Sequence, residues 1–246
     1  RCVWALRCSC RRCCWWHLAR AAPQGLLATL DRPGAAMGRK AGSELEQLGC
    51  SVCEFKPGRL YFSALGSPEL LRGARLLEHV GVVVLRRGEE AASSFLGCEG
   101  AERETCLERI CSAVLAVDWR SPLALWSLLV GRSPGPGGVP RFRVRAKRSV
   151  KASKDVLPSD AIAYAVGQAL EERFAWLVDL ESPEVEVRVH LSKDELLVSL
   201  PALVQPDGSH GCHLAHAGLH PSVSWAMAKT LGARAGDVVL DPMCGR

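Results

Sequence analysis

The 246-residue sequence lacks any long run of apolar residues, although apolar residues make up 48% of it. The longest apolar stretches, around residues 80–85 and 124–130, are far shorter than the ~20 residues that a membrane-spanning helix needs. The apolar share is nevertheless sufficient for a packed core. The composition therefore predicts one or two globular domains and no membrane contact.

A complete zinc-binding pattern is also missing, even though the chain contains 12 cysteines. Cys50 and Cys53 have the spacing of half a zinc site, but no second Cys-x-x-Cys or His pair follows at a suitable distance. Histidines crowd together over residues 210–220, where glycines favour a loop and no carboxylate or thiol pair completes a catalytic signature. We predict reduced thiols, no metal ion and no catalytic residue in this chain.

The first 40 residues show neither a helical nor a strand period. They mix cysteines, tryptophans and arginines, and position 1 is an arginine rather than a methionine. Three interpretations remain open: an Arg-rich transit peptide, sequence upstream of a start at Met37, or a fragment boundary. We predict an irregular or unstructured leader over residues 1–40.

Residues 41–97 carry alternating strand and helix signals. Ser43 with Glu46 resembles the capping box of a short helix, and strands are predicted at residues 52–56, 60–63 and 80–85. Between them, Pro68 lies at the start of a helix whose apolar positions recur at helical spacing up to residue 77. This β-β-α-β order predicts a small α/β sandwich of ferredoxin-like type.

Residues 98–205 form the second predicted unit. We expect helices at 102–117, 122–130 and 158–174, with a Pro/Gly-rich loop at 133–138 and strands at 178–180, 185–191 and 196–200. Valines alternate with charged residues over 185–191, which predicts one buried and one wet face. His190 lies on the wet face, so we interpret it as a surface residue rather than a catalytic base.

Acidic residues are absent between residues 141 and 154. Cationic and apolar side chains alternate from 141 to 148, which predicts a strand with one core face, containing Phe142, and one basic face. A solvated strand face is the ordinary outcome for a charge run, but a ridge of one sign is tolerated mainly where a polyanion binds. The pattern favours nucleic acid, held through its phosphates. The residues predicted to contact it are Arg141, Arg143, Arg145, Lys147, Arg148, Lys151 and Lys154.

The stretch from Gly236 to Arg246 has the pattern of a buried strand that leads into a ligand-binding turn. Residues 238–240 form a short apolar run typical of a strand in a parallel sheet. Pro242 ends the strand, and Gly245 permits a tight turn and close approach of the backbone to a ligand. Open α/β sheets hold nucleotide-like cofactors at the carboxyl ends of such strands, although a plain strand followed by a turn has the same pattern.

Several of these segments resemble one known family. Residues 218–227, Gly-Leu-His-Pro-Ser-Val-Ser-Trp-Ala-Met, followed by 237–245, Asp-Val-Val-Leu-Asp-Pro-Met-Cys-Gly, resemble the start of the methyltransferase domain of the THUMP-domain RNA guanosine-N2 methyltransferases. Residues 142–145, 165–167, 176–180 and 183–187 resemble their THUMP domain. Residues 41–97 resemble the ferredoxin-like domain that precedes it, although the first strand and helix of that domain are not recognisable.

The resemblance implies a mixed α/β (α+β) fold: a ferredoxin-like domain over residues 41–97, a THUMP RNA-binding domain over 98–205, and a connector over 206–246 with only the first helix and strand of a Rossmann-like methyltransferase domain. It also implies S-adenosylmethionine as the cofactor of the parent protein. The residues implied to contribute to the cofactor site are Asp241, Pro242, Met243, Cys244 and Gly245.

The implied activity of the parent is methyl transfer to guanosine N2 in a structured RNA, either tRNA or a small nuclear RNA. The family's Asn/Asp-Pro-Pro-aromatic motif is absent here, and His220 and Arg246 replace residues that are usual in the family. We therefore expect this chain to be an RNA-targeting part without activity. The family's small zinc-containing activator subunit docks on the catalytic domain, so we expect it to bind the full-length parent and not this chain.

DNA and membranes are not expected as partners, and the nucleus or the cytoplasm is the expected location. The alternative is a stand-alone THUMP RNA-binding module without catalytic activity, in which the C-terminal strand has no role.

Overall fold

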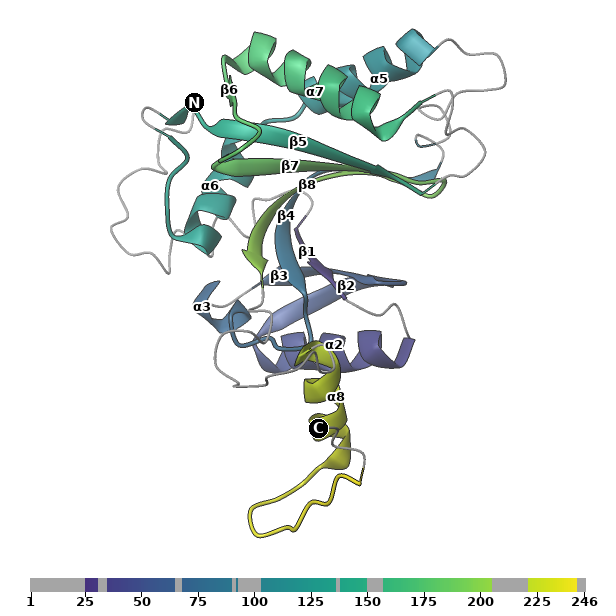
Figure 1. The fold of residues 1–246 in the computed structure, drawn as a ribbon, viewed down its shortest axis with the longest axis vertical. Helices are drawn as coiled ribbons and strands as arrows, with labels where there is room; N and C mark the ends of the chain where they lie inside the picture. Colours follow the sequence, from purple (N-terminus) through teal and green to yellow (C-terminus); the bar gives the residue numbers. More distant parts are fainter. Residues whose placement is uncertain are drawn as a thin grey trace.

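The computed structural model describes residues 25–30, 35–64, 68–89, 92, 103–135, 138–149, 157–204 and 221–242. Their strands form one sheet of eight strands in the order β2-β3-β1-β4-β8-β7-β5-β6. Figure 1 shows this sheet running through the molecule, with helices at its two ends. Because β4 and β8 pair directly, the two units predicted from the sequence share a single sheet.

The N-terminal half of the sheet has the element order β-α-β-β-α-β. All its strand pairs are antiparallel, and β1 lies between β3 and β4. This is the element order of ferredoxin-like folds. Its elements are β1 (Leu26–Thr29), α2 (Ala35–Gln47), β2 (Cys50–Lys56), β3 (Arg59–Ala64), α3 (Pro68–Leu71) and β4 (His79–Arg87).

The prediction of an irregular leader up to residue 40 is wrong for the residues described there. β1 occupies Leu26–Thr29, and α2 begins at Ala35, so Ser43 and Glu46 lie in the last turns of a helix instead of capping its start. β1 is short, but it pairs on both sides. β1 is stabilised by pairing with β3 and β4, which are distant from it in the sequence. Such pairing produces no periodic pattern within β1 itself.

The predicted helix after Pro68 is shorter than expected. α3 ends at Leu71, and the chain continues in turns up to β4. Ala74 and Leu77 are nevertheless fully buried, each with 0% exposure. Leu71 also lies in the core, but Leu70, which has the same apolar spacing, is 46% exposed, and the extent of the helix was wrong.

The second half of the sheet contains parallel as well as antiparallel pairs. β5 lies parallel to both β6 and β7, and β7 forms an antiparallel hairpin with β8. The predicted strands at residues 141–148 and 185–191 are confirmed. Its elements are α5 (Arg103–Leu115), α6 (Arg120–Val130), β5 (Arg141–Arg148), α7 (Ser159–Phe174), β6 (Leu177–Val178), β7 (Val185–Leu191) and β8 (Leu196–Val204).

Pro201 does not end β8, although the prediction stopped that strand at residue 200. The register between β4 and β8 shifts between Val80 and Gly81, and Gly81 pairs with Pro201. A bulge beside a proline accommodates the missing N–H donor. The longer strand extends the pairing of β4 with β8, which joins the two halves.

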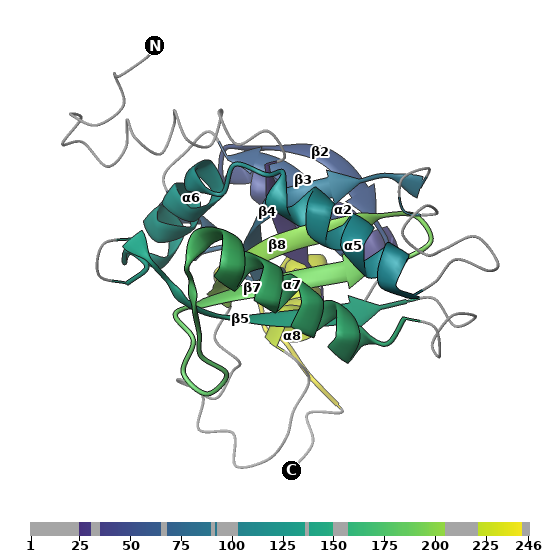
Figure 2. The same ribbon diagram turned by 90° about the horizontal axis from the view of Figure 1, so that it is seen from above.

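Helices cover one face of the sheet, and we call the other face the helix-free face. Buried side chains of α2, α5, α6 and α7 belong to one core cluster with those of the strands, and Figure 2 shows α5 and α7 side by side across the sheet. The helix-free face holds a separate small apolar cluster of Leu27, Tyr61, Val83 and Leu197. In Figure 1, α7 lies above β5 and β7 whereas α2 lies below β2 and β3, so twist turns the helix-free sides of the two halves toward each other.

The C-terminal helix α8 (Pro221–Leu231) lies beyond the sheet, next to α2. Trp225 Nε1 donates a hydrogen bond to Glu44 Oε1 at 3.0 Å, and the Arg75 guanidinium lies 4.8 Å from the centre of the Trp225 ring. Glu44 is only 5% exposed. These contacts orient α8 against the N-terminal half.

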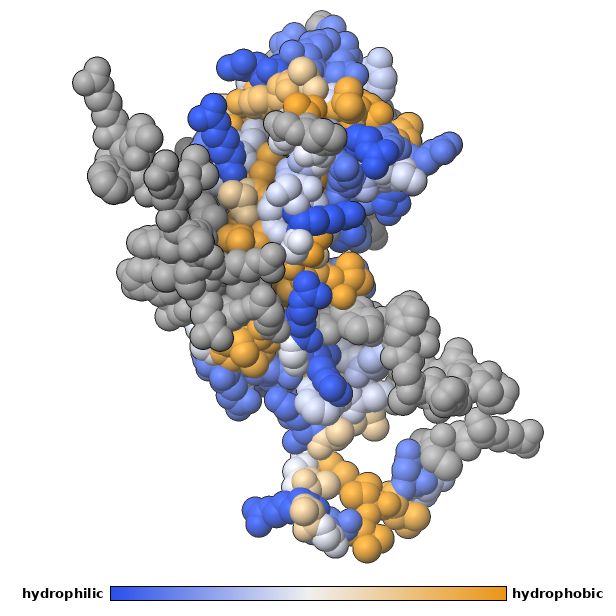
Figure 3. Space-filling model, turned by 90° about the vertical axis from the view of Figure 1, so that its left-hand side faces the viewer, coloured by the Kyte–Doolittle hydropathy of each residue, from blue (hydrophilic) through white to orange (hydrophobic). Residues whose placement is uncertain are grey.

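The prediction of a buried strand at residues 238–240 is wrong for this structure. Val238, Val239 and Leu240 are 98%, 57% and 85% exposed, and no described strand pairs with them. Figure 3 shows their apolar surface at the lower end of the molecule. An apolar run supplies the side chains of a buried strand, but strand geometry depends on hydrogen bonds to neighbouring strands.

Within the described residues, no single helix has both the length and the hydrophobicity needed to cross a bilayer. One pair of helices, Arg103–Leu115 and Arg120–Val130, meets those criteria when taken together, with a bend of 71° between them.

Candidate nucleic-acid interface

Cationic side chains of β5 lie on the helix-free face. Burial alternates along the strand, with Phe142 fully buried on the core side and Arg141, Arg145 and Lys147 exposed on the other. Val144 shares the core side, because a Cβ on Gly167 of α7 would lie 3.7 Å from Val144 Cγ2. The predicted division of this strand into a core face and a basic face is confirmed.

Three of the residues predicted to contact nucleic acid do not belong to the described basic face. By strand alternation Arg148 belongs to the core-side set, and it is aligned with the buried Leu191 rather than with the other cations. Lys151 and Lys154 lie outside the described residues. The described basic face of β5 therefore consists of Arg141, Arg143, Arg145 and Lys147.

Glu186 of β7 lies at the centre of this face. Its carboxylate accepts hydrogen bonds from Arg143 Nε at 2.8 Å and from Arg188 Nε at 2.6 Å, and Arg145 Nε lies 3.3 Å away. The side chain of Glu186 is only 14% exposed. We call these four residues, Arg143, Arg145, Glu186 and Arg188, the Glu186 cluster.

The Glu186 cluster has a net positive charge. Burial raises the pKa of Glu186, but hydrogen bonds from Arg188 and Arg143 outweigh this effect, so the pKa lies below its ordinary value of 4.5. One ionised carboxylate between three arginines leaves a net charge of +2. The basic run of β5 contains no acidic residue in the sequence. In the fold, Glu186 of the neighbouring strand β7 neutralises part of its positive charge.

The arginines of this cluster keep donors available to solvent. Arg143, Arg145 and Arg188 side chains are 26%, 61% and 39% exposed. A guanidinium carries five N–H donors, so an arginine held by a carboxylate on one side can still bind a phosphate on the other. Such a fixed cationic surface is suited to binding anions.

Arg141 and Lys147 extend the face at its two ends. Arg141 lies 3.4 Å from Asp179 and 3.7 Å from Glu184, while its side chain remains 51% exposed. Lys147 is exposed and forms no ion pair within the described part of the chain. Electrostatic attraction of a polyanion is therefore strongest toward the middle and the Lys147 end of β5.

A second carboxylate cluster lies where the two halves of the sheet meet. Glu195, in the turn between β7 and β8, is only 2% exposed and accepts hydrogen bonds from four side chains of the N-terminal half. The distances are 2.8 Å for Lys56 Nζ, 2.6 Å for Arg59 Nη1, 2.8 Å for Tyr61 Oη and 3.1 Å for Arg86 Nε. We call these five residues the Glu195 cluster.

The Glu195 cluster was missed by the reasoning from sequence. Its partners lie 109 to 139 residues away from Glu195 along the chain, so no local pattern links them. Burial raises the pKa of Glu195, but hydrogen bonds from Lys56, Tyr61 and Arg86 outweigh it and lower the pKa from 4.5 to about 2. The carboxylate is consequently ionised throughout the physiological pH range.

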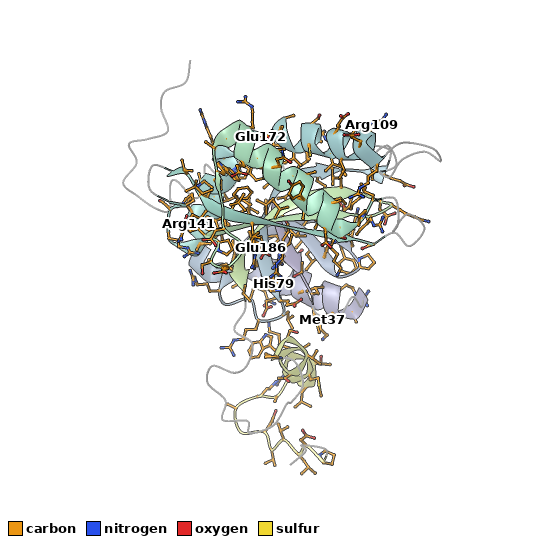
Figure 4. The ribbon with its side chains drawn as sticks, turned by 45° about the horizontal axis from the view of Figure 1, so that its top comes forward. Met37, His79, Arg109, Arg141, Glu172 and Glu186 are labelled. Atoms are coloured by element: carbon orange, nitrogen blue, oxygen red, sulfur yellow. The ribbon has the colours of Figure 1, made fainter. Side chains whose placement is uncertain are left out.

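Two histidines lie on the same face, His190 beside the Glu195 cluster and His79 beside the Glu186 cluster. His190 was expected to be a surface residue, but it is half-buried, and its Nε2 forms a hydrogen bond of 2.8 Å with Ser149 Oγ. Burial, together with the positive charge of Arg59, lowers the pKa of His190 to about 4, so it is neutral at pH 7. Figure 4 shows His79 close to Glu186, on the side away from Arg109 and Glu172 of helices α5 and α7.

Metal-ligating residues do not gather in the described structure. Across residues 25–242, apart from the stretches that are not described, no three His, Cys, Asp or Glu residues lie close enough to hold a metal ion. The histidines of residues 210–220 lie outside the described residues. Cys50 is buried, which raises its pKa to about 11 and keeps it a neutral thiol.

Two of the five residues predicted to contribute to a cofactor site, Asp241 and Pro242, lie within the described structure. Asp241 and Pro242 are exposed and follow an exposed segment, so no crevice between paired strands lies beside them. Met243, Cys244 and Gly245 lie outside the described residues. The role of all five residues at a cofactor site stays a prediction.

Comparison with known proteins identifies the domain that carries the Glu186 cluster. Residues 104–200 match the model of the THUMP domain, so the chain contains a THUMP domain. Over 104 residues the chain is 36% identical to the U6 snRNA (guanine-N(2))-methyltransferase THUMPD2 of Mus musculus, covering 42% of this chain and 19% of that protein. Over 110 residues it is 30% identical to the tRNA (guanine(6)-N(2))-methyltransferase THUMP3 of Mus musculus, covering 44% and 21%.

The matched segments span about a fifth of the length of these relatives. Among solved structures, TrmN from Thermus thermophilus has a TM-score of 0.59 and 25% identity, and the match covers 86% of this chain and 55% of that one. A predicted N6-adenine-specific DNA methylase from Listeria monocytogenes has a TM-score of 0.57 at 17% identity, covering 87% and 50%, which is a likeness of fold alone. The resemblance found in the sequence, to THUMP-domain RNA guanine-N2 methyltransferases, is thereby confirmed.

Proposed function

We propose that this chain binds structured RNA through the helix-free face of β5 and β7, as the targeting part of an S-adenosylmethionine-dependent RNA guanine-N2 methyltransferase. The observation that carries the proposal is the Glu186 cluster: three arginines are held by one half-buried carboxylate within a THUMP domain. Relatives that share this domain are named as guanine-N2 methyltransferases of U6 snRNA and of tRNA.

Preorganised arginines suit a folded RNA. An arginine whose rotamer is already fixed by Glu186 loses less conformational entropy on binding a phosphate than a free surface side chain does. Phosphate contacts fix position and orientation but read no sequence, so recognition would depend on the shape of the RNA. Phe142 is fully buried and unavailable for stacking on bases.

The finer assignment follows the family resemblance. We propose that the ferredoxin-like unit, including β1 and α2, and the THUMP domain deliver tRNA or a small nuclear RNA to a catalytic domain, of which residues 206–246 contribute the connector, α8 and the Asp241–Gly245 turn. On this proposal the chain by itself transfers no methyl group and does not bind the zinc-containing activator subunit. The parent would act in the nucleus or the cytoplasm, where its RNA substrates occur.

A gel mobility shift assay tests the RNA-binding part of this proposal. The probes are total tRNA, a U6 snRNA stem-loop and a DNA duplex of equal length, and the variant is Arg141→Glu with Arg145→Glu. The matched control, Arg103→Glu with Arg120→Glu, changes the charge equally on exposed helix residues. We expect salt-sensitive RNA binding that the first variant loses and the control retains. Equal loss in both variants, or no RNA binding by the wild type, would contradict the proposal.

Calorimetric titration with S-adenosylmethionine separates the chain from a complete enzyme. We expect no heat of binding, because Asp241 and Pro242 are exposed and follow the exposed residues 238–240. Measurable binding would show that the chain holds a cofactor site and that our proposal of an inactive targeting part is wrong.

A further inference from the structure

Glu195 joins residues from both halves of the sheet. The carboxylate comes from the turn between β7 and β8, whereas Lys56, Arg59 and Arg86 come from β2, β3 and β4. All three cations lie within 3.1 Å of one carboxylate that is 2% exposed. A buried carboxylate with several partners fixes the relative position of the groups it binds, because any displacement leaves a buried charge without its hydrogen bonds.

Two cations of the Glu195 cluster, Arg86 and Lys56, make further contacts, and Lys56 Nζ lies 3.9 Å from Glu54 Oε1. Both terminal nitrogens of Arg86 donate to Glu54, at 2.6 and 2.9 Å, and its guanidinium lies 3.8 Å from the centre of the Tyr61 ring. Lys56, Arg59 and Arg86 keep 29%, 21% and 24% of their side-chain surface exposed. The three cations are therefore immobilised and still accessible to an anion.

The Glu195 cluster adjoins the basic face of β5. Lys147 is aligned with His190 in the parallel pairing of β5 with β7. The positive charges of Arg59 and Lys147 both act on the His190 ring, which places β3 and β5 cations around the same residue. Positive charge thus continues from the THUMP half across the junction into the N-terminal half.

We propose that Glu195 is a positioning residue that holds Lys56, Arg59 and Arg86 at a fixed distance from the Glu186 cluster, so that a folded RNA contacts both clusters at once. This inference rests on the proposed RNA-binding function. Rigid placement of two cationic clusters favours an RNA whose phosphates have the matching spacing, and it gives no advantage to a flexible strand.

A positioning role of Glu195 and a purely electrostatic role predict opposite results for the variant Glu195→Gln. It removes one negative charge from a surface that binds a polyanion, so electrostatics alone predicts tighter binding of every RNA. Positioning predicts instead that affinity for tRNA falls about fivefold or more, while affinity for oligo-uridine of equal length stays unchanged or rises. Tighter binding of both RNAs would overturn the inference.

Glu195→Asp provides a second variant without any change in charge. It retracts the carboxylate by one methylene, so positioning predicts weaker tRNA binding, whereas a role of charge alone predicts wild-type affinity. The matched control is Glu46→Gln, which removes one negative charge at an exposed residue of α2 that belongs to neither cluster. We expect the control to bind tRNA at least as tightly as the wild type. Melting temperatures identify any variant that fails to fold.

Hydrogen exchange distinguishes failure of this inference from failure of the proposed function. We expect faster exchange in residues 56–61 and 192–197 of Glu195→Asp than in the wild type, whether or not RNA binds. If the wild type binds no RNA, the proposed function fails. If tRNA binds and both Glu195 variants bind it as tightly as the wild type, only the positioning role fails.

Discussion

Removing two exposed cations from β5 should weaken RNA binding through the loss of two phosphate contacts. The change is Arg145→Gln with Lys147→Gln. Each phosphate contact contributes about 0.7 to 0.9 to the slope of log affinity against log salt concentration, so the slope should become shallower by about 1.4 to 1.8. Between 50 and 200 mM salt, the difference in affinity between wild type and variant should then shrink about ninefold.

The stability of this variant should remain close to that of the wild type. Arg145 is 61% exposed and contributes one long ion pair of 3.3 Å, which is expected to supply less than ~1 kcal/mol. Fluorescence anisotropy with labelled tRNA over a series of salt concentrations measures the slope. The control, Arg103→Gln with Arg120→Gln, lowers the net charge equally. An unchanged slope, or equal slopes for the two double variants, would refute the reasoning, because charge alone and not position would then determine binding.

Three further predictions concern the fold that supports this face. Because burial lowers the pKa of His190 to about 4, the unfolded chain binds more protons between pH 6.5 and 4, so stability should fall over that range. In chemical denaturation of His190→Gln, the free energy of unfolding should fall less between pH 6.5 and 4 than in the wild type, by roughly 3 kcal/mol at most. A pH profile identical to that of the wild type would contradict the lowered pKa of His190. Glu44→Ala leaves the N–H donors of Leu76 and Trp225 without their acceptor, at a cost of about 1–3 kcal/mol each, and hydrogen exchange in α8 should accelerate while α7 is unaffected. Gly81→Ala places a Cβ 2.9 Å from the backbone oxygen of Leu200 and should destabilise the protein by about 1–3 kcal/mol. Gly88→Ala, whose Cβ meets nothing within 4 Å, is the matched control, and equal melting temperatures for these two variants would contradict the close contact.

Local periodicity predicted the strands and helices of the second half well. The alternation over Val185–Leu191 and the apolar face of α7 appear in the structure as the buried sets Val185, Val187, Val189 and Leu191, and Ile162, Val166 and Leu170. Each of these elements buries one face in the core, so the spacing of its apolar residues identifies that face. β1 has no comparable signal, since its four residues are stabilised by pairing with β3 and β4.

The sequence predicted which face of β5 is basic, but it did not predict how much of the charge on that face is neutralised. The basic face of β5 follows from alternation, but its neutralisation by Glu186 depends on the parallel register that aligns Arg143 with Glu186. The Glu195 cluster depends on pairing between β4 and β8, which brings distant segments together. Neither partner is close in sequence, so a run of like charges overestimated the free positive charge of the folded face.

The C-terminal segment illustrates a different limit of sequence reasoning. Residues 238–240 have the apolar composition of a buried strand, yet they are exposed where no described strand pairs with them. Apolar composition shows that a segment is suited to burial. Whether it forms a strand depends on the neighbouring strands with which it can pair.

Mapping the residues that contact bound RNA is the most direct test of the central claim, that RNA binds the helix-free face of β5 and β7. Photo-crosslinking of bound tRNA, followed by mass spectrometry of the peptides, reports which face contacts the nucleic acid. Our account predicts crosslinks in β5 and β7, with further crosslinks around Arg59 and Arg86 at the junction, and none in α5 or α7. Crosslinks concentrated in α5 and α7, with the β5 and β7 peptides unmodified, would contradict the account.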